Sequence, residues 1–404
     1  MIELPYLTPD SPGIGGQIKE CPEDFRVDEV PLYSPCGEGT HLYFRLTKAG
    51  IPTPAAISRI ARYMNVAPAE IGFAGLKDAQ ALTTQIMSLE HADERRLASL
   101  SDPAMTIEIL ARHGNKLRTG HLAGNRFSIR LRQVEPAAAI EPARRILDVL
   151  ERRGVPNYFG PQRFGARGDT GDLGEMLVKG NLDEFIARYL GRPRKTDPED
   201  CRAARDAFDG GFFARALERW PRHYADERRA LSAYKKRQHA GPAVGAIDKR
   251  MKRLYVSAFQ SMIFNEVLSR RLESLDKVFV GDLAQKVDSG GVFRVEDATV
   301  EQPRAERFEI SPTGPIPGYR SDLASGEPGE IESAALAKFS VTTESFRGAS
   351  AIGAKGARRA LRFNPGCVSL TPGSDARGEF LELSFNAPSG CYATALLREL
   401  MKTP

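Results

Sequence analysis

The alternation of hydrophobic and polar positions predicts short strands near both ends of the chain. Residues 18–30 and 40–46 alternate in this way and carry the β-branched and aromatic side chains typical of strands. The segment 34–39 between them is rich in turn-forming residues. Further short strands are expected at 71–74, 81–89 and 380–385.

Helical spacing of apolar residues predicts several helices among these strands. Thr53 followed by Pro54 is typical of a helix start, with Thr53 as N-cap, and Ile57, Ile60 and Met64 then share one face. Other helices are expected at 140–153, 252–272 and 392–402. Strands and helices do not follow each other in a regular βαβ rhythm, so the pattern favours an α+β fold over a doubly wound sheet.

A change in helical character and arginine content along the chain predicts two domains. From about residue 157 to about residue 344 the sequence becomes helical and rich in arginine, and then returns to short strands. We therefore expect one domain formed by residues 1–156 and 345–404, and a second domain inserted as residues 157–344.

Composition excludes several classes of protein. No run approaches the roughly 20 apolar residues that cross a bilayer, and the start of the chain lacks the features of an export signal, so we expect a cytoplasmic protein with no membrane partner. The five cysteines and six histidines are not spaced as metal ligands, so no metal site is predicted. The net charge of +5 and the basic run from Lys235 to Arg253 suit a polyanion, although a solvated helix face is the simpler interpretation of that run.

The segment with the clearest chemistry is the loop Gly75-Leu76-Lys77-Asp78, which follows one short strand and precedes another. A carboxylate at the end of a buried strand can face a cleft from a rigid support. The alternative is a turn in which Asp78 caps the next element and Lys77 is solvated.

The segment from Gly72 to Gln85 resembles the signature of the TruD family of pseudouridine synthases, in which the aspartate of the GxKD loop is catalytic. Other motifs that are similar to that family follow in the same order along nearly the whole chain. They are Lys19 with Pro22–Glu29, Gly124–Phe127, Asn157–Gly165, Tyr255–Asn265, Thr313–Pro315, Gly356–Arg359 and Tyr392–Glu399.

This resemblance implies a pseudouridine synthase catalytic domain with a mixed, largely antiparallel sheet, an inserted α+β TRUD domain, and a V-shaped cleft for RNA. The implied activity is isomerisation of uridine to pseudouridine in tRNA, commonly at uridine 13, with no cofactor and no obligatory protein partner. The long arginine-rich insertion resembles archaeal and eukaryotic members, which leaves other RNAs open as substrates.

The resemblance also assigns roles to single residues. Asp78 would be the catalytic group, Phe127 would stack on the target uracil and Asn125 would read its edge, although Phe127 could be a core residue and Asn125 could hold its own loop. Lys19 is the first candidate for a cation that keeps Asp78 ionised, and Arg398 or Arg359 is the second, although each could equally be a surface residue or contact an RNA phosphate. The full set of candidates for binding substrate or RNA is Lys19, Lys77, Asn125, Phe127, Gln162, Arg163, Phe164, Arg359 and Arg398.

Two other RNA-directed functions are alternatives to a pseudouridine synthase, and a sequence feature argues against each. A non-catalytic RNA-binding or RNA-chaperone protein would have no need of the Asp78 carboxylate, which this chain retains. A methyltransferase would need a glycine-rich loop for adenosylmethionine after a strand, and the sequence offers none.

Overall fold

The structure, a computed structural model, describes residues 4–403, and the chain divides into two compact units. The sheet unit comprises Tyr6–Val155 and residues 363–403, and the helical unit comprises residues 4–5 and Pro156–Arg362. The chain passes between the units at β7 (Val155–Pro156) and β12 (Arg362–Phe363), which pair with each other.

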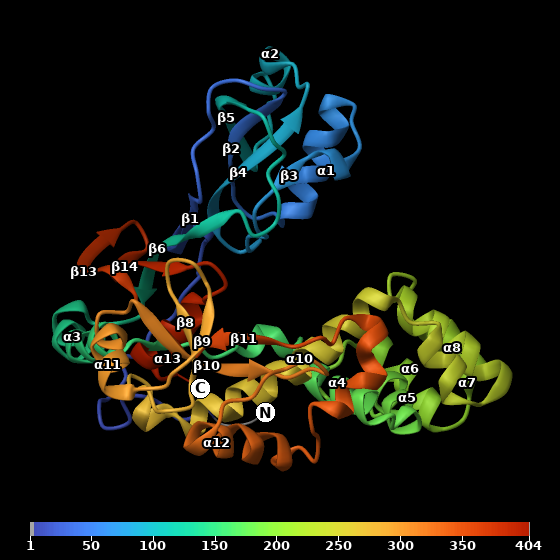
Figure 1. The fold of residues 1–404 in the computed structure, drawn as a ribbon. Helices are drawn as coiled ribbons and strands as arrows, with labels where there is room; N and C mark the ends of the chain where they lie inside the picture. The colour runs from blue at the N-terminus through green and yellow to red at the C-terminus, as the bar shows by residue number, and fades with distance from the viewer. Residues whose placement is uncertain (1–3, 404) are drawn as a thin grey trace. The chain divides into compact units, whose positions relative to one another are not determined.

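The sheet unit combines a large sheet with a few helices (Figure 1). Its elements are η1 (Pro22–Asp24), β1 (Phe25–Pro31), β2 (His41–Lys48), α1 (Thr53–Met64), η2 (Pro68–Glu70), β3 (Gly72–Phe73), β4 (Leu82–Glu90), α2 (Glu94–Ala98), β5 (Met105–His113), β6 (Leu122–Arg132), α3 (Pro136–Arg153), β13 (Gly366–Asp375), β14 (Gly378–Pro388) and α13 (Ala393–Met401).

The sheet is mixed and largely antiparallel, as expected. Its strand order is β13-β14-β6-β1-β4-β2-β5, with β3 paired to β4. Strands β1 and β4 run parallel, and the other neighbours run antiparallel. This order places β1 between β6 and β4, so residues of three strands far apart in sequence can meet at one place.

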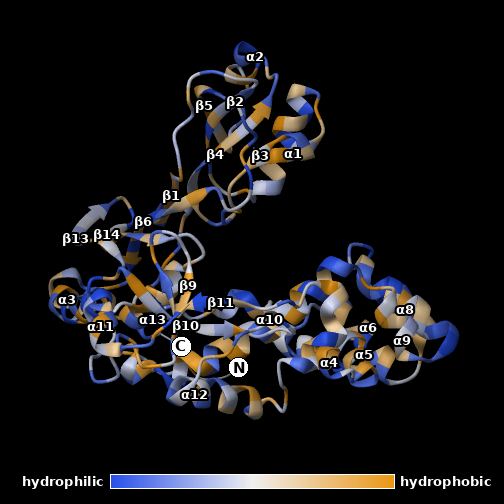
Figure 2. Ribbon diagram, viewed as in Figure 1, coloured by the Kyte–Doolittle hydropathy of each residue, from blue (hydrophilic) through white to orange (hydrophobic). Residues whose placement is uncertain are grey.

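Helix α1 covers one part of this sheet, as its apolar face predicted. Ile57, Ile60 and Met64 pack with Phe44 and Leu46 of β2 in one buried cluster. Figure 2 shows hydrophobic residues on α1 and β4, whereas the short helix α2 is hydrophilic. Apolar burial of this kind contributes about 25 cal/mol per Å² and fixes α1 against the sheet.

The first predicted strand begins later than expected. Residues 18–30 were expected to form one strand, but Pro22–Asp24 form a 3-10 turn and β1 starts at Phe25. The turn is stabilised by Asp24, which is fully buried and pairs with Arg132 at 2.6 Å between Oδ1 and Nη2. A local pattern of alternation cannot reveal a partner more than 100 residues away, which explains the error.

Helix starts also differ by a few residues from the expected positions. Helix α3 begins at Pro136, where Glu135 accepts a hydrogen bond from the N–H group of Ala138 at 2.8 Å. Helix α10 (Lys249–Arg270) begins three residues early and is capped by Asp248. In α1 the N-cap is Pro52 rather than Thr53, because the Thr53 hydroxyl bonds elsewhere.

The helical unit surrounds the long helix α10 (Figure 1). Its other elements are η3 (Pro161–Phe164), α4 (Thr170–Lys179), α5 (Leu182–Leu190), α6 (Glu199–Asp209), α7 (Phe213–Arg219), α8 (Ala225–Arg237), α9 (Ala240–Gly245), η4 (Leu272–Ser274), β8 (Leu283–Lys286), β9 (Val292–Arg294), α11 (Ala298–Glu306), β10 (Ile310–Ile316), α12 (Gly326–Lys338), η5 (Glu344–Ile352) and β11 (Ala357–Ala360).

Two buried clusters and a small sheet hold this unit together. Phe259 and Ile263 of α10 pack with Phe346 of η5. Helices α5 to α9 enclose a second core that contains the fully buried Trp220. The strands form a four-stranded sheet in the order β11-β10-β8-β9, so β11 lies within this unit.

Candidate active site

The loop that carries Asp78 joins β3 to β4 and is held from beneath by three buried side chains. Lys48 Nζ donates to the carbonyl of Asp78 at 2.9 Å. The Thr53 hydroxyl accepts a hydrogen bond from the N–H group of Lys77 at 2.9 Å, and Gln85 Nε2 donates to the carbonyl of Gly75 at 3.1 Å. These contacts fix the loop backbone, while 45% of the Asp78 side chain stays exposed.

Asp78 forms an ion pair with Lys19 from the segment before β1. Its other carboxylate oxygen accepts a hydrogen bond from the N–H group of Gln80 at 3.0 Å. Partial burial is the largest single influence on the pKa of Asp78 and raises it, but the Lys19 hydrogen bond and charge together with the backbone N–H groups outweigh it. The pKa is therefore lowered, and Asp78 is a carboxylate at neutral pH. Of the three candidate cations, Lys19 is the one that the structure pairs with Asp78.

The backbone of Lys19 is unusual. Its φ angle is +63°, in the left-handed region that residues with a side chain rarely adopt. From this position Lys19 Nζ also lies 4.5 Å from the centre of the Phe25 ring. The ammonium group is therefore held between a carboxylate and an aromatic face, two groups that both favour a positive charge.

Lys77 points into the sheet unit rather than into solvent. Its Nζ donates to Oδ1 of Asn125 at 2.7 Å and lies 3.1 Å from Glu29 Oε2, and both charged side chains are almost fully buried. Glu29 and Asn125 are paired residues of β1 and β6. Asn125 thus holds Lys77 and, through Lys77, the loop. Its predicted contact with uracil would use the amide nitrogen, because the amide oxygen accepts from Lys77.

Phe127 lies in an aromatic cluster near the same strands. Its ring stacks on Phe385 with centres 5.1 Å apart and meets the edge of Phe25 at 6.2 Å. Only 6% of Phe127 is exposed. The ring is therefore part of the core, and its stacking on a target base stays a prediction.

The other candidates occupy different positions. Arg398 lies in the sheet unit, 3.9 Å from the centre of the Tyr6 ring and 3.4 Å from the Glu399 carboxylate. Arg359 belongs to the helical unit, where it donates to Asn157 Oδ1 at 2.5 Å and lies 4.4 Å from the Phe159 ring centre.

Gln162, Arg163 and Phe164 also belong to the helical unit, in the turn η3. Arg163 donates to the Ser261 hydroxyl of α10 at 3.3 Å, and it faces the same Phe159 ring as Arg359, at 5.5 Å. The structure thus brings together Lys19, Lys77, Asp78, Asn125 and Phe127 in the sheet unit, and the motif 157–165 with Arg359 in the helical unit.

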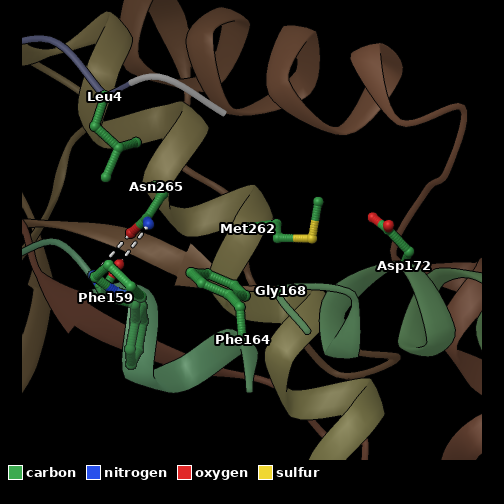
Figure 3. Close-up of a pocket in the computed structure, with 8 residues that line it drawn as sticks. Leu4, Phe159, Phe164, Gly168, Asp172, Met262 and Asn265 are labelled. Atoms are coloured by element: carbon green, nitrogen blue, oxygen red, sulfur yellow. Dashed lines mark hydrogen bonds between the residues drawn. The ribbon is translucent and has the colours of Figure 1, made fainter. Parts of the chain in front are cut away.

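A cavity of about 260 Å³ lies beside this motif (Figure 3). Asn265 lines it and exchanges two hydrogen bonds of 2.9 Å with the backbone of Phe159. Its walls are mainly apolar, with Asp172 at one end. The residues that line it are Leu4, Phe159, Pro161, Phe164, Gly168, Asp172, Met262 and Asn265.

Sequence reasoning missed several residues around Asp78, above all Lys48. In β2, Leu42, Phe44, Leu46 and Lys48 share one face because alternate residues of a strand point the same way. The first three are buried apolar residues, so the pattern itself marks Lys48 as a lysine that points inward. Phe25, Glu29 and Gln85 lie within the motifs that resemble the family, but the sequence assigned no role to their side chains.

Residues 4–403 contain no candidate metal site and no candidate membrane span. No group of three or more His, Cys, Asp or Glu residues there could hold a metal ion. No helix in the same range is long and apolar enough to cross a membrane.

Comparison with known proteins covers almost the full chain. The family model of tRNA pseudouridine synthase D (TruD) matches residues 1–400. The tRNA pseudouridine synthase D of Geobacter sulfurreducens is 45% identical over 99% of this chain and 97% of its own length. That of Syntrophotalea carbinolica is 42% identical over 98% of this chain and 99% of its own length.

A solved structure agrees with these matches. The crystal structure of a protein described as tRNA pseudouridine synthase D (TruD) from Methanosarcina mazei superposes with a TM-score of 0.85, at 29% identity, and covers 100% of this chain and 99% of that one. Identity is thus higher to the Geobacter and Syntrophotalea proteins than to the Methanosarcina protein. The chain belongs to the tRNA pseudouridine synthase D (TruD) family, a family of isomerases.

Proposed function

We propose that this protein converts uridine 13 of tRNA to pseudouridine in the cytoplasm, with the Asp78 carboxylate as the catalytic group. The observation that carries the proposal is the geometry of Asp78: an ionised and accessible carboxylate on a loop held by buried side chains. Membership of the TruD family supports tRNA as the substrate.

The reaction needs no redox equivalent. The N1–C1′ bond of uridine breaks, the uracil turns, and C5 bonds to C1′; the C5 proton is lost and N1 regains a proton. Asp78 could attack C1′, attack C6, or assist removal of the 2′ proton, and each path requires a carboxylate beside the sugar. Lys19 would keep that carboxylate ionised.

The target base must leave its stack to reach Asp78, at a cost of a few kcal/mol. We propose that the aromatic cluster beside Lys19 offsets part of this cost, with Phe127 as the stacking ring. Asn125, on the same strand, would contact the uracil edge.

We also propose that the helical unit is the family's inserted TRUD domain, predicted as residues 157–344, and that it contacts RNA. Lys235, Lys236 and Arg237 are exposed at the end of α8, and Lys249 and Arg250 are exposed at the start of α10. Cations at a helix N-terminus oppose the helix dipole, so helix stability does not explain the last two. Contacts with RNA phosphates would explain why Lys249 and Arg250 lie there.

The direct test is to map pseudouridines at nucleotide resolution in tRNA treated with the pure protein and no added cofactor. We expect one modification, at uridine 13, and none in a matched tRNA with cytidine at that position. Pseudouridine elsewhere would contradict the assigned position. Tight RNA binding without any pseudouridine would favour the non-catalytic RNA-binding alternative.

Phe127→Leu should reduce both stability and turnover. Loss of a buried stacked ring should lower the free energy of unfolding by about 1–3 kcal/mol. Loss of a stack on the base should lower turnover per folded molecule by about tenfold or more. Phe127→Tyr, which keeps the aromatic face, should retain more activity.

The matched control is Phe385→Leu, which removes the other ring of the same stack. This variant should be destabilised by a similar amount and lose less turnover per folded molecule than Phe127→Leu. Thermal unfolding and turnover should be measured on the same preparations. A Phe127→Leu protein that is destabilised yet fully active would remove Phe127 from the site.

A further inference from the structure

Lys48, at the end of β2, is a buried lysine directly beneath the loop that carries Asp78. Only 1% of it is exposed. Its Nζ donates to the carbonyl of Asp78 at 2.9 Å and to the carbonyl of Ile51 at 2.8 Å. Within residues 4–403 the structure shows no ion pair for this ammonium group.

Stability does not explain a lysine at this position. Its neighbours on the same face of β2 are Leu42, Phe44 and Leu46, and an apolar side chain would continue that face at less cost. Burial is the largest influence on Lys48 and lowers its pKa to about 8. The ammonium group is therefore charged at neutral pH at the expense of folding free energy.

Asp78 is the acidic group that acts on the Lys48 ammonium group. Thr83 of β4 and Met105 of β5 lie opposite it in the sheet, and neither is ionisable. The charged groups that act on Lys48 are Asp78, which favours the ammonium form, and Lys77, which disfavours it. Asp78 is thus the negative group to which Lys48 responds.

The neutral groups Thr53 and Gln85 already hold the loop at Lys77 and Gly75. Lys48 holds it at Asp78 itself, and it differs from the other two because it brings a positive charge. A carboxylate that must meet one atom of a sugar needs its position fixed to within about 0.5 Å.

We propose that Lys48 is a positioning residue for Asp78, whose ammonium charge fixes the loop backbone at that residue and adds a second positive charge, besides Lys19, near the carboxylate. This inference rests on the proposed catalytic role of Asp78. Lys48 need not touch the substrate; it acts through the aspartate.

The test compares the pH dependence of turnover in wild type and Lys48→Met. At pH 7 the variant should turn over 10- to 100-fold more slowly. The ratio of wild-type to variant turnover should then fall as pH rises through about 8, because wild-type Lys48 loses its charge there. Titration of the RNA affects both proteins alike and cancels in the ratio.

Lys402→Met is the matched control. Lys402 also donates to two backbone carbonyls, those of Thr8 and Ser11, and burial also lowers its pKa. This variant should lose stability while its turnover stays within about twofold of wild type at every pH. Lys48→Arg, which stays charged, should keep more activity than Lys48→Met and show no loss through pH 8.

A ratio of wild-type to Lys48→Met turnover that is constant from pH 6 to 9.5 would overturn the inference and leave Lys48 a packing residue. If Lys48→Met does not fold, wild-type turnover that shows no decrease near pH 8 would overturn it equally. Failure of the proposed function looks different, since wild type would then form no pseudouridine or Asp78→Asn would remain active.

Discussion

Asp78→Asn should retain less than about one hundredth of wild-type turnover, a loss of roughly 3 kcal/mol or more in transition-state stabilisation. The amide has nearly the same shape as the carboxylate, and it can still accept the hydrogen bond from Gln80. It cannot act as a nucleophile or base. Single-turnover assays should show the loss, while filter binding shows RNA affinity within about threefold of wild type.

Asp102→Asn is a close control for this substitution. Asp102 also accepts a hydrogen bond from the N–H group two residues later, that of Ala104 at 2.9 Å, and also pairs with a cation, Arg59 at 3.1 Å. Its replacement should leave turnover unchanged. An Asp78→Asn protein with more than a hundredth of wild-type turnover would show that Asp78 is not the catalytic group.

Lys19→Met should produce the second large loss, and that loss should depend on pH. The proposed role of Asp78 requires a carboxylate, so activity should be present above the pKa of Asp78 and lost below it. Lys19 lowers that pKa, whereas burial raises it. Without Lys19 the acid limb of the turnover profile should therefore move to higher pH, with a loss of about tenfold at pH 5 and a smaller loss at pH 8.

Turnover measured from pH 5 to 8 tests this expectation, with Lys19→Arg as the variant that keeps the charge. Lys19→Arg should hold the acid limb close to its wild-type position. If Lys19→Met has lower turnover but an unmoved acid limb, the ion pair does not control the ionisation of Asp78.

Local patterns were sufficient for much of the fold because they depend on near neighbours. The positions of β2, α1, β4 and α13 follow from alternation or helical spacing, and each lies within a few residues of its predicted range. Where prediction failed, a distant partner decided the outcome. The start of β1 depends on the ion pair between Asp24 and Arg132. Thr53 does not cap α1 because its hydroxyl donates a hydrogen bond to Gln85.

The candidate site shows the same division. The Lys77-Asp78 loop was found through its family resemblance, and the choice of Lys19 among three cations could be made only with the structure, since 59 residues separate it from Asp78. The inward direction of Lys77 was not predicted, because Glu29 and Asn125 come from two other strands. Lys48 was the exception, because its position after Leu42, Phe44 and Leu46 on one face of β2 already indicated that it points inward.

The left-handed backbone of Lys19 means that a substitution chosen for stability could remove a side chain needed for the proposed activity. Glycine adopts that conformation without strain, so a search for thermostable variants would favour glycine at this position. Such a variant would relieve the backbone strain but would lose the cation that pairs with Asp78. The lysine present here is the more strained residue, and libraries designed for stability should hold this position constant.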